Sequence, residues 1–485
     1  MKIYDVIIIG AGVVGTAIAR ELSRYELKTA VLEKEIEPAF GVSKSNSGII
    51  HPGTQNHCNS LKGRLCVEGN KLMRGIAHEL GVDFKEVGEL IVVFNKKDIP
   101  RLIKLKEEAE KLGVPKIQIV GRGWLKEHEP NLSKKAIAAL YAPTAGILSP
   151  YRLVYDMIEN AQNNGVEVYA QQEVIQIKPS KIRGSKKQGY FEIITSSKRK
   201  FKTKYIINSA GLFADDISKL AGIDDFKIKP RKGEEFILDK KKEHITNHLL
   251  FPLPAKKSKG VLIIKTSAGN PMIGPTACDC VDKYDLSTTD AGLKKVLSSV
   301  KRMIPSISHK DIIAYFAGLR PAAGEDFIIR HEDKVPGFIN VAGIQSPGLT
   351  AAPAIALMAC AILRQQGVNL KKKKIFHKTR EKTTHLFEMP FSHTEKIIKE
   401  DPDYGDIVCR CEMVSAKEIK EAIKRGAKTL DGIKFRTRAQ AGRCHGSFCT
   451  CRILKILAEN SKRPITQITK KGAGSEIVLE KRCND

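Results

Sequence analysis

Residues 5–15 read DVIIIGAGVVG, an apolar run with β-branched members that ends in three spaced glycines. The run predicts a buried strand, and the helical periodicity from Val13 to Leu22 predicts a helix directly after it. The first glycine, Gly10, permits a tight turn, and the third, Gly15, lets helix and strand pack closely. The second, Gly12, lets the backbone approach a pyrophosphate. The stretch therefore predicts the opening of a βαβ unit.

A second predicted strand, Thr29 to Glu33, completes this unit and ends in an acid. Glu33 lies where a carboxylate can hold a ribose hydroxyl, and the free N–H groups of the helix N-terminus can bind phosphates. An accidental glycine-rich turn is the alternative. The glycines, the predicted strand and helix around them, and the acid together favour a dinucleotide site.

Two later strands, 205–211 and 337–343, also run into helical stretches, 215–221 and 351–364. The blocks between these segments mix strand-like alternation with charged helices, which indicates a second domain inserted twice. The expected fold class is α/β: a Rossmann-type nucleotide-binding domain over 1–370 with an inserted α+β substrate domain, plus a small, mainly helical cysteine domain. The expected nucleotide-binding parts are about 1–86, 144–227 and 305–370, and the substrate parts are about 87–143 and 228–304.

Composition excludes several function classes. The 485 residues are 42% hydrophobic, and no apolar run approaches the roughly 20 residues that a membrane helix needs. The net charge is +28, but the lysines are spread along the chain and aromatics make up only 6%, so we expect no nucleic-acid binding. The first residues lead into a strand without a cleavage site, which predicts a cytoplasmic location. A positive surface still favours the arrival of a small anionic substrate.

Two segments extend the nucleotide-binding pattern, Ser209-Ala210-Gly211 at the end of a strand and the turn at residues 342–350, AGIQSPGLT. Together with the N-terminal glycines they resemble the glycine-oxidase and glycerol-3-phosphate-oxidase superfamily of flavoenzymes, in which the last turn lies against the isoalloxazine. The resemblance implies FAD as cofactor. The further residues that it implies for FAD binding are Ser47, Gly211, Gly343, Ser346, Gly348, Leu349 and Thr350.

The segment SNSGIIHPG at residues 45–53 resembles two members of that superfamily, glycerol-3-phosphate oxidase or dehydrogenase and L-2-hydroxyglutarate dehydrogenase. Oxidation of a secondary alcohol needs a base for the hydroxyl proton, and imidazole titrates in a useful range. The resemblance implies that His51 is this base. A loop histidine that is hydrogen-bonded to backbone is the alternative.

An anionic substrate needs fixed cations, and the planar guanidinium of arginine suits carboxylate and phosphate. Residues 317–321, AGLRP, match the superfamily motif whose arginine holds the substrate, which implies Arg320 as the anchor. The Lys259-Gly260-Val261 segment looks more like the glycerol-3-phosphate oxidases, in which a lysine at this position lines the active site. A surface ion pair for Arg320 and a solvated loop lysine for Lys259 are the alternatives.

A cysteine-rich module follows a polar linker or strap at 371–405 and occupies 406–485. Cys409-x-Cys411 and Cys444-x₄-Cys449 flank a helix-like segment, a spacing that suits structural zinc or a small iron-sulfur cluster. The Cys444 surroundings resemble the bacterioferritin-associated-ferredoxin-like domain. That resemblance implies a [2Fe-2S] cluster, with structural zinc as the alternative and Cys451 as a spare or substitute ligand.

These resemblances imply oxidation of sn-glycerol 3-phosphate to dihydroxyacetone phosphate, in which His51 takes the proton, FAD takes the hydride and Arg320 holds the phosphate. Electrons would pass through the cluster to a partner subunit or a quinone-linked acceptor, with the chain peripheral to a membrane through that partner. The near alternative is L-2-hydroxyglutarate oxidation. Alternatives from other classes are a non-catalytic electron-transfer subunit and an RNA-binding flavoprotein, the latter expected to show steep salt dependence.

Overall fold

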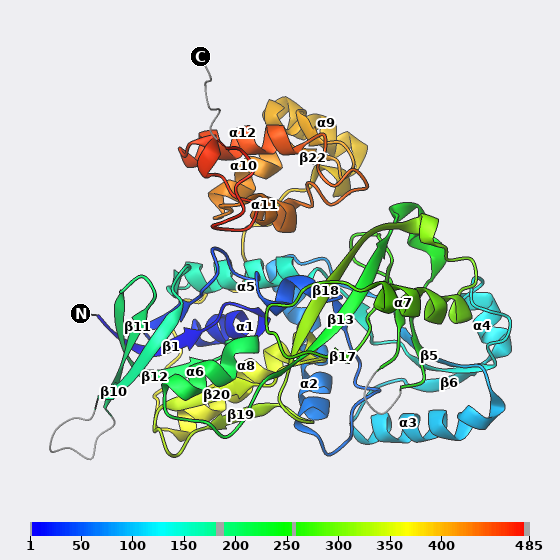
Figure 1. Ribbon diagram of the computed structural model, residues 1–485, viewed down its shortest axis with the longest axis horizontal. Coiled ribbons are helices and arrows are strands. Elements are labelled where there is room, and N and C mark those ends of the chain that lie inside the picture. The colour runs from blue at the N-terminus through cyan, green and yellow to red at the C-terminus, as the bar shows by residue number, and fades with distance from the viewer. Residues whose placement is uncertain (1, 181–188, 255–258, 480–485) are drawn as a thin grey trace.

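The computed structural model describes residues 2–180, 189–254 and 259–479, whose elements form three parts (Figure 1). The first part is built on an eight-stranded sheet in the order β10-β11-β12-β1-β2-β9, with β20 beside β12 and β19 beside β20. Strand β1 pairs in parallel with both β2 and β12. The strands are β1 (Ile3–Ile9), β2 (Thr29–Leu32), β9 (Glu167–Tyr169), β10 (Val174–Ser180), β11 (Tyr190–Thr195), β12 (Lys200–Asn208), β19 (Ile328–His331) and β20 (Phe338–Ala342).

Strand β1 is buried on both faces, which explains its continuous apolar run. Val6 and Ile8 pack into the core formed with helices α1, α2, α5 and α8, whereas Ile7 and Ile9 pack on the α6 side of the sheet. The predicted α/β architecture is confirmed, and the helix predicted after the glycines has the predicted bounds. The helices of this part are α1 (Val13–Leu22), α2 (Leu61–Leu80), α5 (Pro150–Asn163), α6 (Ala214–Leu220) and α8 (Gly348–Gln365).

Helix α8 is a core helix. Among the described residues it is the one helix long and apolar enough to cross a membrane, but 67% of it is buried inside the protein. It packs closely on α2, where a Cβ on Gly69 would lie 2.0 Å from the Thr350 carbonyl oxygen. The N-terminus of α8 is therefore fixed against α2 at the centre of the molecule.

The second part is a nine-stranded sheet in the order β17-β13-β16-β15-β14-β5-β7-β6, with β18 paired to β13. Helix α7 packs on β13 and β16, and α3 and α4 pack near β6 and β7. A separate three-stranded sheet, β3-β8-β4, is also present. The elements are β3 (Ile49–Ile50), β4 (Lys85–Glu86), β5 (Glu89–Val93), β6 (Gln118–Gly121), β7 (Ala138–Ala142), β8 (Gly146–Ile147), β13 (Lys229–Leu238), β14 (Leu249–Pro252), β15 (Leu262–Ile264), β16 (Met272–Gly274), β17 (Cys278–Asp279), β18 (Ile312–Ala322), α3 (Ile99–Lys111), α4 (Arg122–His128) and α7 (Asp290–Met303).

Strand β18 corrects one expected boundary. The sequence analysis assigned 305–370 to the nucleotide-binding domain, but β18 forms a long antiparallel ladder with β13, from Lys229 opposite Ala322 to Leu238 opposite Ile312. Because backbone pairing decides which sheet a strand joins, this segment belongs to the substrate-domain sheet. The chain returns to the first sheet only at β19.

The polar segment from 371 to 405 runs along the first part as a strap and includes helix α9 (Phe391–Glu400). The carboxamides of Asn160 on α5 and of Asn164, which caps that helix, both donate to the His377 carbonyl oxygen at 2.9 Å. Arg380 forms an ion pair with Asp156 at 2.8 Å, and both side chains are buried. The strap is therefore bonded to the first part of the fold along its first half.

The third part is a small module with its own apolar core, drawn in orange and red at the top of Figure 1. Helix α10 begins at a capping box in which Ser415 and Glu418 satisfy each other's backbone N–H groups. A polar cavity of about 230 Å³ separates the module from α5 and the strap. The elements are β21 (Ile407–Cys409), β22 (Val414–Ser415), α10 (Ala416–Lys424), α11 (Leu430–Thr437) and α12 (Thr450–Ser461).

Candidate functional site

The glycine turn between β1 and α1 has the close contacts that require glycine. Gly10 has a φ of +101°, in the region that side chains avoid. A Cβ on Gly15 would lie 2.0 Å from the Gly10 carbonyl oxygen, so no larger residue fits there. The first-turn N–H groups of α1 therefore start at the carboxyl end of β1, where such groups can bind a phosphate, and the Val13 N–H among them donates to Ser43 Oγ at 2.9 Å.

Glu33 lies at the end of β2, beside this turn. Its carboxylate accepts hydrogen bonds from the Ala11 N–H at 2.6 Å and the Glu35 N–H at 2.9 Å. Burial raises the pKa of Glu33, and these two backbone bonds act against that rise. The carboxylate is thus fixed in place at the edge of the cradle, and its remaining lone pairs can accept from ribose hydroxyls. These residues fit a dinucleotide.

The other residues implied for FAD binding lie on the loops around this cradle. Gly211 follows β12, and Ser47 precedes β3. Gly343 follows β20, and the turn with Ser346 leads into α8, whose first residues are Gly348, Leu349 and Thr350. Thr350 Oγ1 accepts the His51 N–H at 2.9 Å. The start of α8 is therefore bonded to the loop that carries the predicted base.

His51, whose side chain is 11% exposed, lies among polar groups from three other segments. Its Nε2 lies 3.5 Å from Lys259 Nζ and 3.4 Å from Ser346 Oγ. Its Nδ1 lies 3.6 Å from Glu89 Oε2, on a carboxylate that is itself buried in β5. The structure therefore brings two of the three predicted catalytic residues, His51 and Lys259, into contact.

The electrostatics of this cluster keep the imidazole neutral. Burial and, to a smaller extent, the positive charge of Lys259 lower the pKa of His51 to about 4, and the Glu89 carboxylate acts in the opposite direction. Burial also lowers the pKa of Lys259, against the attraction of Glu89. Burial raises the pKa of the Cys66 thiol to about 12, so this neighbour stays protonated. An unprotonated Nε2 is thus available at neutral pH.

Arg320 projects from β18 on the same face as Gly233 of the paired strand β13. A Cβ at Gly233 would lie 2.6 Å from an Arg320 terminal nitrogen, so this glycine makes room for the guanidinium. Both terminal nitrogens donate to the Thr276 carbonyl oxygen at 3.4 Å. Burial lowers the pKa of Arg320, the nearby Glu235 acts against this, and the guanidinium stays cationic.

Sequence reasoning missed the two buried acids of the site, Glu89 and Glu235. Glu89 opens the apolar strand β5, and Glu235 directly precedes the apolar end of β13, Phe236 to Leu238. An acid next to an apolar run was the available signal, because carboxylates are seldom buried without a role or a partner. Oε2 of each acid is buried and has no hydrogen-bond partner among the described residues.

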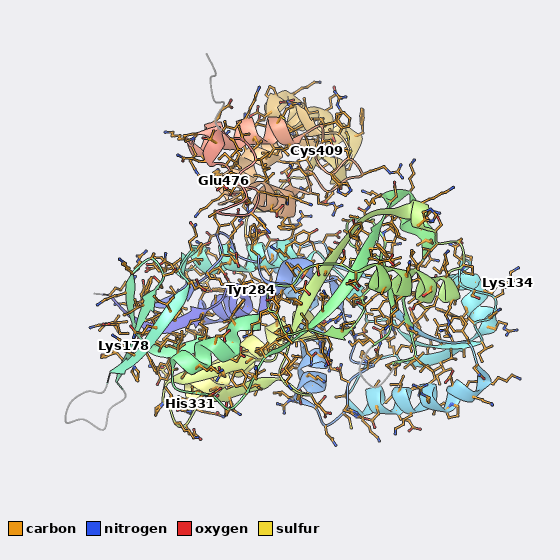
Figure 2. All side chains as sticks on the ribbon, viewed as in Figure 1. Lys134, Lys178, Tyr284, His331, Cys409 and Glu476 are labelled. Atoms are coloured by element: carbon orange, nitrogen blue, oxygen red, sulfur yellow. The ribbon has the colours of Figure 1, made fainter. Side chains whose placement is uncertain are left out.

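The predicted metal ligands lie in two loops of the C-terminal module, where Figure 2 labels Cys409. The Cys411 thiol donates to Cys444 Sγ at 3.5 Å. Burial, and after it the neighbouring Cys409 thiol, raise the pKa of Cys449 to about 12. Within the described ranges no three or more His, Cys, Asp or Glu side chains are gathered as a metal site, so the sulfurs stand as two pairs. Cys451 is exposed in the first turn of α12.

Two family matches cover most of the chain. Residues 5–362 match the family described as FAD dependent oxidoreductase, and residues 407–459 match the BFD-like [2Fe-2S] binding domain. A glycerol 3-phosphate dehydrogenase from Caloramator mitchellensis is 40% identical over 478 residues, which are 98% of each chain. A glycerol 3-phosphate oxidase from Mycoplasma genitalium is 32% identical and matches 77% of this chain and 97% of its own length.

Solved structures agree with the match to the FAD-dependent oxidoreductase family. A dithionite-reduced L-alpha-glycerophosphate oxidase from Mycoplasma pneumoniae with FAD bound has a TM-score of 0.73 at 31% identity, over 78% of this chain and 99% of the other. Glycine oxidase from Geobacillus kaustophilus, at 22% identity with a TM-score of 0.67, covers 79% of this chain and 100% of its own and shows the shared fold alone. The iron-sulfur prediction holds over its zinc alternative. The chain belongs to the FAD-dependent oxidoreductase family, and it carries a C-terminal BFD-like [2Fe-2S]-binding domain.

Proposed function

We propose that this chain oxidises sn-glycerol 3-phosphate to dihydroxyacetone phosphate and passes the electrons to another protein through its C-terminal domain. The observation that carries the proposal is the imidazole of His51 in contact with one cation, Lys259, whose charge in turn interacts with that of a second, Arg320. Such a pocket suits a small anion that carries a secondary alcohol. The choice of phosphate is supported by the full-length similarity to an enzyme named glycerol 3-phosphate dehydrogenase.

His51 acts as the proton acceptor. With its pKa held near 4 in the free site, the imidazole is neutral, and its Nε2 lies on the Lys259 and Ser346 side of the ring. A bound phosphate offsets the positive charge of Lys259, which raises the affinity of Nε2 for the hydroxyl proton. The Glu89 carboxylate at Nδ1 then stabilises the imidazolium that forms.

Arg320 and Lys259 bind and orient the substrate. The Arg320 guanidinium offers a planar pair of donors to phosphate oxygens, and its position is fixed by the β13 and β18 ladder. When bound, FAD would supply the hydride acceptor for the substrate carbon, and a [2Fe-2S] cluster would supply a one-electron carrier. Gly10, Gly12, Gly15 and Glu33 would hold the dinucleotide, and Cys409, Cys411, Cys444 and Cys449 would hold the cluster.

Oxidation of L-2-hydroxyglutarate is the second candidate, because the human enzyme named for that substrate is 28% identical over 75% of this chain. Anaerobic mixing with each compound separates the two. We expect sn-glycerol 3-phosphate to bleach the oxidised flavin band and L-2-hydroxyglutarate to leave it unchanged. Bleaching by the dicarboxylate alone would reverse the assignment, and activity that survives His51→Ala in the assembled protein would favour a non-catalytic subunit.

A further inference from the structure

The two cysteine loops of the C-terminal module, 409–413 and 443–451, have one face that contacts the first two parts of the fold. We call these two parts together the catalytic part. These contacts reach the substrate-domain sheet near the start of β18 and the end of β13, so they fix which side of the loops points inward. They are His445 Nε2 with the Ile313 carbonyl oxygen at 2.6 Å and Arg443 with Asp239 at 2.9 Å. Arg438, which follows α11 and precedes the second loop, donates to Asn270 Oδ1 at 3.0 Å.

The same loops expose apolar side chains beside the cysteines. Phe448, the residue before Cys449, is 84% exposed, and Met413, two residues after Cys411, is 40% exposed. Cys411 itself is exposed and contacts Cys444. Scattered apolar residues on a surface are normal, but this exposed phenylalanine and methionine lie in the same two loops as the candidate ligands, and exposed aromatic side chains are common binding sites for partners. We call Cys411, Met413 and Phe448 the outer patch.

Charge around the outer patch selects the partner. Residues 407–459 contain twelve Lys and Arg against five Asp and Glu, and the whole chain carries a net charge of +28. Arg410 lies between the first two cysteines and is exposed, and Lys455 is exposed one turn after Cys451 on α12. A positive rim around an apolar centre attracts a partner with an acidic rim and repels a basic one.

We propose that the outer patch is the docking site for an acidic protein that carries one electron at a time. This inference rests on the proposed function of the C-terminal domain. Oxidation of one substrate alcohol releases two electrons and two protons. The electrons leave one by one from the cluster to two carrier molecules, whose oxidised centres are reduced, and the protons pass to water. The inner face is occupied by the catalytic part, so the outer patch is the side from which a carrier reaches the cysteines.

The test uses the full-length holoprotein and two haem proteins of opposite charge. The protein is first reduced with dithionite, the excess is removed, and reoxidation by acidic cytochrome b5 or by basic cytochrome c is followed by stopped flow. Reduction by dithionite makes the test independent of the substrate, so failure of the proposed substrate and failure of the docking site give different results. Iron content and flavin absorbance are measured on every variant.

We expect faster transfer to cytochrome b5 at low salt, with a rate that falls as salt rises. Phe448→Ser should slow it roughly tenfold, as expected for an aromatic residue at the centre of an interface. Arg410→Glu and Lys455→Glu should each slow transfer to cytochrome b5 and speed transfer to cytochrome c. Phe391→Ser is the matched control, because Phe391 is 89% exposed at the start of α9 and belongs to neither cysteine loop.

Three results would overturn the proposal. The first is equal rates for the two carriers with the same response to salt. The second is a Phe448→Ser variant that matches Phe391→Ser while it retains its iron. If Phe448→Ser loses its iron, that variant is set aside and the test rests on Arg410→Glu and Lys455→Glu. The third result would then be that both of these variants keep the wild-type preference between cytochrome b5 and cytochrome c.

Discussion

Replacing Glu235 by glutamine should change how the affinity for an anionic substrate depends on pH. Burial raises the pKa of Glu235 to about 7, and Arg320 acts against that rise. Below this pH the carboxyl is protonated, and the guanidinium is free to bind the substrate anion. Above it a carboxylate forms beside Arg320 and competes with the substrate. The wild-type kcat/KM should therefore fall as pH rises through about 7.

The size of the effect follows from the titration. At about pH 8 roughly one molecule in eleven keeps Glu235 protonated, so kcat/KM falls by roughly tenfold if only this form binds well. The substrate phosphate itself titrates near pH 6. Because Glu235→Gln shares that titration, the ratio of wild-type to variant kcat/KM isolates the carboxyl. The assay is initial-rate kinetics at several pH values for both proteins.

The raised pKa of Glu235 also makes the free energy of unfolding depend on pH. A carboxyl whose folded pKa lies above its ordinary value of 4.5 stabilises the fold below that pH, and the contribution is lost as pH rises through about 7. Glu235→Gln should therefore flatten the fall in unfolding free energy over this window.

A wild-type to variant kcat/KM ratio that stays constant from about pH 6 to about pH 9 would refute the reasoning about Arg320.

Three further predictions concern the base, the cradle and the metal site. His51→Asn should slow anaerobic flavin reduction by about 10² to 10⁴ with the flavin content unchanged, and an equally fast variant would exclude His51 as the base. Gly15→Ala places a Cβ 2.0 Å from a backbone oxygen and should lower the flavin-to-protein ratio after purification, whereas Gly75→Ala, with nothing within 4 Å, should not. Cys411→Ser should lower the iron and sulfide content of the purified protein, because Cys411 contacts Cys444. Cys451→Ser should leave that content unchanged, because Cys451 belongs to neither sulfur pair. Loss of iron in Cys451→Ser but not in Cys411→Ser would show that Cys451 is the ligand instead.

Local pattern was enough to predict the first part of the fold. The run before Gly10 and the periodicity after Gly12 lie within one stretch of chain, and their strand and helix form with nearly the predicted bounds. Strand β18 was assigned to the wrong domain, because its sheet is decided by pairing with β13, which lies far away in sequence. Local sequence patterns do not encode which distant strand supplies the backbone partner.

The candidate site, like the fold, could be predicted only where a short stretch of sequence carried the information. His51 and Arg320 were named from short motifs that a family shares. Glu89 and Glu235 were missed, because each matters only through a neighbour that the fold supplies: the ring of His51 for one, and the guanidinium of Arg320 for the other. A sequence can flag an acid within an apolar strand, but the partner that gives the acid its chemical role comes from the tertiary fold.

The C-terminal module contacts both the nucleotide-binding domain and the substrate-domain sheet. Glu37 of the nucleotide-binding part is buried, accepts the Lys428 N–H at 2.9 Å and forms an ion pair with Arg436 of α11. On the other side, Arg443 pairs with Asp239 at the end of β13. One module therefore contacts both the domain that holds the glycine cradle and the sheet that holds Arg320. Because a buried charge without its partner is costly, these contacts favour a single orientation of the cysteine loops. That orientation keeps His445 against the catalytic part and leaves Phe448 in solvent, so the cysteines lie between the site where a substrate would give up electrons and the surface where a carrier would take them.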